Sequence, residues 1–260
     1  MEIIDLDDYH KNTYFKCLED WSEEMDEAGN KKSRWYEIYK EKGLRVKLVI
    51  ENEKAVGMIQ YIPIEQSFVD GKNLYFIYCL WIHSYKQGVG DHRRKGLGKA
   101  LLKAAEEDAR TLGANGIAAW GIALPFWMKA SWFKKQGYRV ADKDGMARLM
   151  WKPFTEEAEK PLWIKQKKKP ELVPGKVTVT SFIHGWCPAQ NIVHERAKRA
   201  SEELGEPVLF REINTSEKEN FHEWGITDAL YINKKRVNTG PPPSYEKIKK
   251  QILHFYSRRM

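Results

Sequence analysis

The stretch 91–102 combines glycines and basic side chains in a pattern suited to a phosphorylated ligand. Gly96 and Gly98 carry no Cβ, so the backbone N–H groups beside them can approach a ligand closely. A helix is expected to begin at Leu97, and the positive end of a helix favours anions. Four basic residues surround the same point, namely Arg93, Arg94, Lys95 and Lys99. The stretch predicts a pyrophosphate-binding loop; the competing interpretation is an ordinary turn with exposed basic side chains.

The spacing of the glycines excludes two common phosphate-binding motifs. A P-loop ends in Gly-Lys followed by Ser or Thr, whereas Gly98-Lys99 is followed by Ala100. A dinucleotide-binding loop carries three glycines in the order G-x-G-x-x-G, and that pattern is not met here. The loop therefore matches neither of these motifs.

A second candidate for chemistry is Cys187, which follows a predicted strand and precedes a predicted helix. The helix dipole and the unpaired amides at a helix N-terminus stabilise a thiolate, so the pKa of a cysteine placed there falls. Pro188 suits the first turn of such a helix. Cys187 is therefore a candidate nucleophile, and a role in packing is the alternative.

Composition and charge limit the classes of function. The chain has 260 residues, 42% of them hydrophobic, and a net charge of +8, which favours a folded protein with acidic ligands. Its three cysteines, an odd number and widely spaced, argue against a disulfide framework and favour a reducing cytoplasm. The acidic start is unlike a secretory signal, and no apolar run approaches the ~18 residues of a membrane span.

Strands and helices alternate around the loop. Leucine and alanine recur at helical spacing over 97–112, which predicts a helix with one buried face that ends at Gly113. A mostly buried strand is expected at 74–82, just before the loop. The other elements expected in this part are helices at 9–21, 32–42 and 127–136 and strands at 44–51, 55–64, 117–122, 138–140 and 148–151.

Prolines and lysines after Trp151 mark a linker. We therefore expect a first domain over 1–155, a linker over 156–175 and a second domain over 176–260. In the second domain, strands are expected at 176–183, 208–213 and 229–232, with helices at 188–204 and 244–257. This order predicts a small α/β sandwich.

The segment Arg93-Arg-Lys-Gly96-Leu-Gly98 matches the Gln/Arg-x-x-Gly-x-Gly/Ala signature of the GNAT acetyltransferases. The order of elements around it also resembles that family, over roughly residues 1–152. The resemblance implies an α/β (α+β) acyl-CoA N-acyltransferase fold with acetyl-CoA as cosubstrate. One departure is the connection 84–91, which is longer than usual and contains two glycines.

The resemblance also implies where acetyl-CoA lies. In the family, the strand before the loop splays from its neighbour and pantetheine occupies the gap, where strand amides polarise the thioester carbonyl. The cofactor contacts implied for this chain are Leu80, Trp81, Ile82, Arg93, Arg94, Lys95, Gly96, Leu97, Gly98, Lys99 and Phe133. The acceptor implied is a small-molecule or peptide amine.

The general acid is the difficult point. Many members of the family carry a tyrosine four residues before a Gly-Phe/Tyr pair, where its hydroxyl protonates the departing thiolate. Here the pair is Gly137-Tyr138, and Phe133 occupies the tyrosine position. The substitute donors that remain open are Tyr78, Cys79, Tyr138 and water.

The base and the acceptor pocket have several candidates. His83 and Glu65 are conceivable bases, although a solvated loop position is the simpler interpretation of each. Cys79 fits core packing better than contact with the acetyl group. The aromatic residues of 120–132, Phe126 and Trp127 among them, fit either a core or an acceptor pocket.

The segment Trp186-Cys187-Pro188 resembles the Trp-Cys-x-x-Cys site of thioredoxin-like proteins, with a compatible element order over 176–260. Two positions depart from that family: Gln190 replaces the second cysteine, and Asp228 stands where a cis-proline is usual. No internal disulfide can form at this motif. The chain as a whole resembles the YoaP-type acetyltransferases.

We therefore expect an N-acetyltransferase with a thioredoxin-like accessory domain. One alternative is a thiol-redox protein that acts through Cys187, with a first domain that only binds CoA; another is a non-catalytic CoA sensor, suggested by Phe133. The lysines of 165–169 fit a solvated linker better than a surface for nucleic acid.

Overall fold

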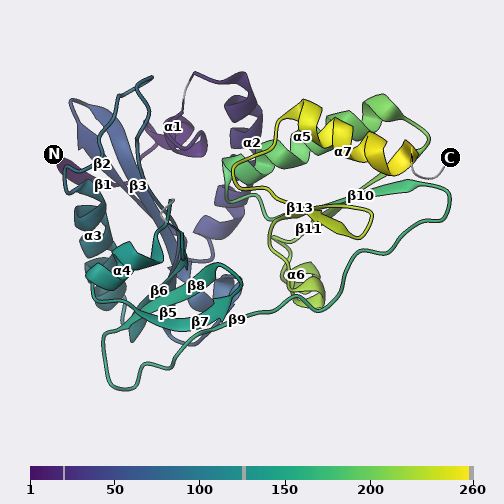
Figure 1. Cartoon of the computed structure of the whole chain (residues 1–260). Coiled ribbons are helices and arrows are strands. Elements are labelled where there is room, and N and C mark those ends of the chain that lie inside the picture. Colours follow the sequence, from purple (N-terminus) through teal and green to yellow (C-terminus); the bar gives the residue numbers. More distant parts are fainter. Residues whose placement is uncertain (20, 125–126, 258–260) are drawn as a thin grey trace. The chain divides into compact units, whose positions relative to one another are not determined.

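A computed structural model describes residues 1–19, 21–124 and 127–257 (Figure 1). The chain divides into two compact units. The first contains 1–21 and 36–164, and the second contains 22–35 and 165–260. In the part of the chain that is described, no helix is both long and apolar enough to cross a membrane.

The first unit is built on a seven-stranded sheet in the order β1-β2-β3-β5-β6-β8-β7. All neighbouring strands are antiparallel except β5 and β6, which run parallel. Its strands are β1 (Glu2–Asp5), β2 (Arg45–Glu51), β3 (Lys54–Pro63), β5 (Leu74–Ile82), β6 (Gly116–Ile122), β7 (Arg139–Asp144) and β8 (Ala147–Pro153). A short pair, β4 (Val69–Asp70) and β9 (Leu162–Trp163), lies outside this sheet.

Helix α3 (Leu97–Thr111) packs its apolar face on the sheet. Leu101, Ala105 and Ala109 are fully buried there, as the sequence pattern predicts. Asp108 fixes the far end of the helix, because its carboxylate accepts hydrogen bonds from Arg45 Nε at 2.9 Å and from the Tyr61 hydroxyl at 2.6 Å. These contacts hold the C-terminal end of α3 against β2 and β3.

Several predicted boundaries were wrong. The helix expected at 9–21 is only α1 (Lys11–Phe15), because Cys17 and Leu18 adopt positive φ and end it. The helix expected at 32–42 is the longer α2 (Glu23–Lys40). The helix expected at 127–136 is α4 (Ala130–Lys135), and Met128 before it has a positive φ of 53°. Strand β1 was not predicted.

The second unit contains a four-stranded sheet in the order β11-β10-β12-β13. Its strands are β10 (Val177–Ile183), β11 (Val208–Asn214), β12 (Ala229–Ile232) and β13 (Lys235–Val237), and its helices are α5 (Pro188–Leu204), α6 (Lys218–Trp224) and α7 (Tyr245–Ser257). Strands β10 and β11 are parallel, and the other pairs are antiparallel. Helices α5 and α7 bury Val193, Ala197, Ile248 and Ile252 on this sheet.

Residues 22–35, the first two thirds of α2, belong to the second unit, which nothing in the sequence pattern indicated. Asn191 of α5 donates a hydrogen bond to the Ala28 carbonyl at 3.0 Å. The Arg196 guanidinium pairs with Glu24, and Lys31 Nζ lies 3.1 Å from Glu195. A buried hydrogen bond from a side chain to a backbone carbonyl and these two ion pairs therefore attach this segment to α5.

Candidate functional site

Strand β5 separates from its parallel neighbour halfway along its length. It pairs with β6 only from Leu74 to Ile77. At the same place its register with β3 shifts, since Gln60 is opposite Cys79 while Tyr61 is opposite Ile77. Tyr78 is therefore the extra residue of a β-bulge, and a bulge bends the strand that carries it. The second half of β5 diverges from β6 for this reason.

Two tryptophans bond to the backbone of β5 on its open side. Trp120 Nε1 donates to the Tyr78 carbonyl at 2.7 Å, and Trp127 Nε1 donates to the Leu80 carbonyl at 3.1 Å. The His83 amide instead donates to Val56 of β3. Because backbone groups alternate along a strand, the amides of Leu80 and Ile82 face the open side and that of Trp81 faces β3. The family resemblance alone does not distinguish these three amides.

The glycine loop leads directly into α3. Gly96 has a φ of +81°, the left-handed region that favours glycine, and occupies the N-cap position. The first amides of a helix have no carbonyl partner within the helix, so those of Leu97, Gly98 and Lys99 are available as donors. A Cβ on Gly98 would lie 3.4 Å from a methyl carbon of Leu80, which places the first turn of α3 beside the open half of β5.

Charges around the loop are partly compensated by acidic neighbours. Arg93 donates to both carboxylate oxygens of Asp91, and hydrogen bonds from Arg93 hold the pKa of Asp91 well below its usual range. Lys95 Nζ lies 3.3 Å from Glu51, which also bonds to His92 at 2.8 Å. The loop is thus held in shape, and exposed basic groups remain for an anion.

A cavity of about 680 Å³ lies between the loop and the open strand. It is lined by Leu80, Trp81, Ile82, Ser84, Arg93, Arg94, Trp127, Met128, Lys129, Trp132 and Phe133. Six of the residues assigned to the cofactor on the family resemblance are among these, and the others form the adjacent loop and first helical turn. Phe126, which was a pocket candidate, lies outside the described residues.

The candidate general acids do not line this cavity. Tyr78 packs between Phe68 and Phe76, and its hydroxyl bonds to the Gln66 carbonyl at 3.5 Å. Cys79 is 4% exposed, and Tyr138 is a core residue whose pKa burial raises well above its usual value. The structure brings none of the three to the cavity wall.

The candidate bases occupy different environments. His83 is fully buried, so the expectation of a solvated loop position was wrong. Glu65 accepts a hydrogen bond from the Asn73 amide at 2.6 Å and serves the turn. Sequence reasoning missed Glu19, whose pKa is raised to about 7 by burial and which bonds to Tyr85. No motif surrounds Glu19, so only the folded structure reveals this group.

Cys187 is the N-cap residue of α5, as predicted, but it is only 7% exposed. Next to it, Asp228 accepts hydrogen bonds from the His184 amide at 3.0 Å and from Trp186 Nε1 at 2.9 Å. A Cβ on Gly185 would lie 3.3 Å from Trp35 Cβ of α2. The thiol is thus part of a closely packed region.

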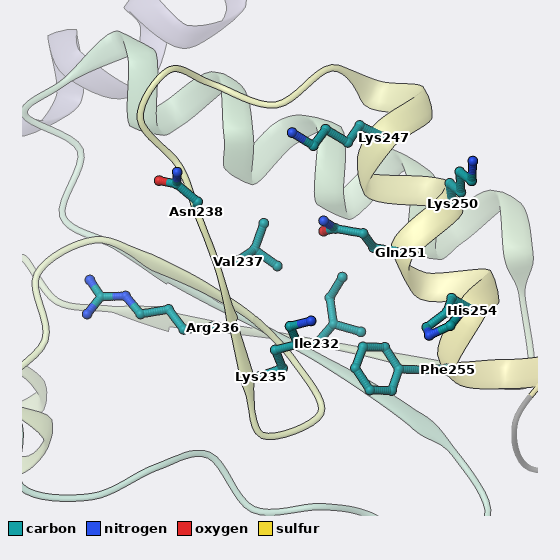
Figure 2. A pocket seen from close by; sticks show the side chains of 10 residues that line it. All are labelled: Ile232, Lys235, Arg236, Val237, Asn238, Lys247, Lys250, Gln251, His254 and Phe255. Carbon is teal, nitrogen blue, oxygen red and sulfur yellow. The ribbon is translucent and has the colours of Figure 1, made fainter.

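A second cavity, of about 610 Å³, lies between β13 and α7 (Figure 2). Figure 2 shows apolar side chains of the sheet and of α7 at its base. The basic side chains that line it are Lys235, Arg236, Lys247 and Lys250. No carboxylate or thiol is among its lining residues, so this cavity offers charge but no nucleophile.

Comparison with solved structures found GNAT proteins at low identity. The PaiA N-acetyltransferase of Thermoplasma acidophilum, solved with coenzyme A, is 18% identical over 59% of this chain and 98% of its own, with a TM-score of 0.44. A GNAT acetyltransferase of Brucella melitensis, solved with acetyl-CoA, is 14% identical over 62% and 94%, with a TM-score of 0.43. The ribosomal-protein-alanine N-acetyltransferase of Brucella melitensis is 16% identical over 59% and 100%, with a TM-score of 0.45. No curated protein matches the chain.

The sequence profile of the acetyltransferase (GNAT) family matches residues 5–138, just over half of the chain. The matched region contains the glycine loop, the bulged strand β5 and α3. The chain therefore belongs to the GNAT acetyltransferase family.

Proposed function

We propose that this protein transfers an acetyl group from acetyl-CoA directly to an amine, which is a small molecule or a peptide. The observation that carries the proposal is the open half of β5 beside the start of α3. Free strand amides, a glycine loop and basic side chains meet there around one cavity. This combination suits a long ligand with a pyrophosphate at one end and a thioester at the other.

Each part of the cavity has a separate task in this proposal. The amides at the start of α3, with Arg93 and Arg94, bind the pyrophosphate. The Leu80 and Ile82 amides bond to pantetheine and to the thioester carbonyl. A donor aimed at the developing oxyanion is typically worth ~10²–10³ in rate. Trp127 holds the Leu80 carbonyl, which fixes this edge of the strand.

The departing thiolate receives its proton from water in this proposal. Phe133 occupies the position of the usual tyrosine and is 1% exposed. None of the residues that line the cavity is a tyrosine or a cysteine. A thiol with a pKa of ~8.5 leaves acceptably as an anion, so catalysis survives without a protein donor.

The second unit serves as a thioredoxin-like accessory domain in the same proposal. Its strand order, with one parallel and two antiparallel pairs, supports this assignment, as does the cysteine at the start of α5. The rival thiol-redox function is not favoured, because Cys187 is only 7% exposed. A thiol must be accessible to attack a disulfide.

Calorimetry with acetyl-CoA tests the proposed function. The wild-type protein should bind with micromolar affinity, about −8 kcal/mol, and Gly98→Glu should abolish measurable binding. Lys103→Ala is the matched control, since it lowers the net charge by the same one unit on the exposed side of α3. Folded wild-type protein that does not bind acetyl-CoA would refute the proposal.

A further inference from the structure

Aromatic side chains continue from the cofactor cavity to the segment before α2. Trp81 lines the cavity, and its ring centroid lies 6.0 Å from that of Tyr85. Tyr85 lies 5.8 Å from Trp21, edge to face. Trp21 and Tyr85 are 41% and 42% exposed, which is unusual for such large rings lying together. We call Trp21, Trp81 and Tyr85 the aromatic cluster.

Beside the aromatic cluster, the described residues include one acidic group bonded to a ring, Glu19. The carboxylate of Glu19 is half-buried and accepts a hydrogen bond from the Tyr85 hydroxyl. Burial raises the pKa of Glu19 to about 7, and the bond from Tyr85 opposes that rise. Among the residues that the structure describes, the Cys17 thiol and the His83 imidazole also face this region. A carboxylate with this pKa is a base suited to neutral pH.

His83 adds a buried acceptor to the same place. Its ring lies 5.5 Å from Trp21 and 5.8 Å from Tyr85. Nδ1 faces the Gly90 carbonyl at 2.6 Å, so Nδ1 carries the proton in the neutral ring. Nε2 is buried and has no hydrogen-bond partner among the described residues. This nitrogen is enclosed by protein atoms, so it does not itself contact a bound ligand.

We propose that the aromatic cluster binds the acceptor as a primary alkylammonium with an apolar body, and that Glu19 takes its proton. This inference rests on the proposed acetyl transfer. Ring faces attract cations, the Glu19 carboxylate bonds to one of the rings, and Trp81 connects this site with the cofactor cavity. The cluster therefore determines both the affinity for the amine and its activation.

The transfer step balances with these groups. The ammonium gives one proton to the Glu19 carboxylate, and the freed nitrogen pair forms a C–N bond with the thioester carbonyl carbon. The C–S bond breaks, and its electron pair leaves on sulfur. The second nitrogen proton passes through water to that thiolate. The products are an N-substituted acetamide, CoA as its thiol and one proton, which Glu19 returns to solvent.

Binding of phenethylamine, followed by tryptophan fluorescence, tests the site without turnover. Phenethylammonium should bind at least ~3-fold more tightly than the neutral phenethyl alcohol, because exposed aromatic rings attract the cation and not the alcohol. Trp21→Ala should weaken phenethylammonium binding ~5-fold or more. Tyr9→Ala removes another exposed aromatic residue as the matched control. Equal binding of the amine and the alcohol, or equal behaviour of the two variants, overturns the proposal.

Acetylation of phenethylamine tests the role of Glu19. In the wild-type protein, kcat/KM should rise through about pH 7 as the carboxylate ionises. Glu19→Gln should lower kcat ~10²-fold and remove this rise, with unchanged affinity for acetyl-CoA. Glu23→Gln, at a nearby exposed carboxylate, is the control. If Glu19→Gln behaves like Glu23→Gln, or if phenethylamine is not acetylated, the inference fails; a loss of acetyl-CoA binding by the wild-type protein would instead refute the proposed function.

Discussion

The starts of α3 and α5 form an instructive pair. Each follows a strand of its own sheet and begins with a residue suited to chemistry, Gly96 in one and Cys187 in the other. The start of α3 borders a cavity and is surrounded by exposed basic side chains. The start of α5 lies beside α2, and Cys187 and Trp186 are each 7% exposed.

The difference shows that a favourable helix N-terminus does not by itself leave space for a ligand. Both helices offer free amides and a positive dipole end. At α3, the bulge at Tyr78 turns the neighbouring strand away and leaves room for a ligand. Just before α5, Gly185 instead packs against Trp35 and against the Lys31 carbonyl of α2. Long-range packing therefore decides which helix start is accessible.

The largest expected effect comes from removing the Trp35 side chain, which packs near the start of α5. Trp35→Ala removes a side chain that is 2% exposed, so the free energy of unfolding should fall by about 3 kcal/mol. The rate at which Cys187 reacts with an aromatic disulfide reagent should rise at least ~10-fold, since the thiol becomes accessible. Mass spectrometry of the labelled peptides separates Cys187 from Cys17 and Cys79.

Unfolding alone could also expose the thiol, so a matched control is needed. Ile248→Ala removes fully buried packing from α7 in the same unit. It should lower stability to a similar degree and leave the native labelling rate of Cys187 near that of the wild type. Equal labelling in the two variants would show that Trp35 is not the cover.

The sequence predicted the parts of the fold that depend on local pattern. The 3.6-residue spacing of α3, the buried strand β5 and the glycine loop are each encoded in adjacent residues, and they lie where expected. Boundaries failed where single residues adopt unusual backbone angles, as at Cys17 and Met128. Positive φ at residues other than glycine has no dependable sequence signal.

The candidate site was predictable to a similar extent. A family signature indicated the glycine loop, but the alternation of amides at Leu80 and Ile82 follows from pairing with β3, which sequence alone does not define. Glu19 comes close to Tyr85 only after folding. The place of residues 22–35 in the second unit likewise depends on contacts with α5, such as that between Asn191 and Ala28.

An effect of intermediate size should come from Asp228, in the packed region beside Cys187, because its ionisation makes the free energy of unfolding depend on pH. Burial raises the pKa of Asp228 from 3.8 to about 6, so the folded state favours the protonated carboxyl. The contribution of this group to the free energy of unfolding is therefore complete below about pH 4 and is lost as the pH rises through about 6. Because Asp228 is partly exposed, we expect about 2 kcal/mol. Urea unfolding should show wild type gaining about 2 kcal/mol relative to Asp228→Asn on going from pH 7 to pH 4.

Taking the difference in free energy of unfolding between the wild type and Asp228→Asn separates the effect of Asp228 from that of other titrating groups. Glu19 titrates in an overlapping range but is present in both proteins, so its effect cancels in the difference. A difference that does not change between pH 4 and pH 7 would show that Asp228 is no less readily ionised in the folded protein than in the unfolded chain.

The smallest effect should come from the ion pairs that attach α2 to α5. Glu24 accepts from Arg196 Nε at 2.8 Å and lies 3.4 Å from Arg199, but it is 38% exposed, so Glu24→Gln should cost about 0.5–1 kcal/mol. Hydrogen bonding to Arg196 lowers the pKa of Glu24 below 4.5, so the cost is present above about pH 4.5 and is lost as the pH falls. It should also shrink in 1 M salt, where the Debye length is about 3 Å. Urea unfolding of Glu24→Gln measures this loss in the free energy of unfolding, with Glu23→Gln as the control. A loss as large as that of Trp35→Ala would mean that charge, rather than packing, keeps Cys187 covered.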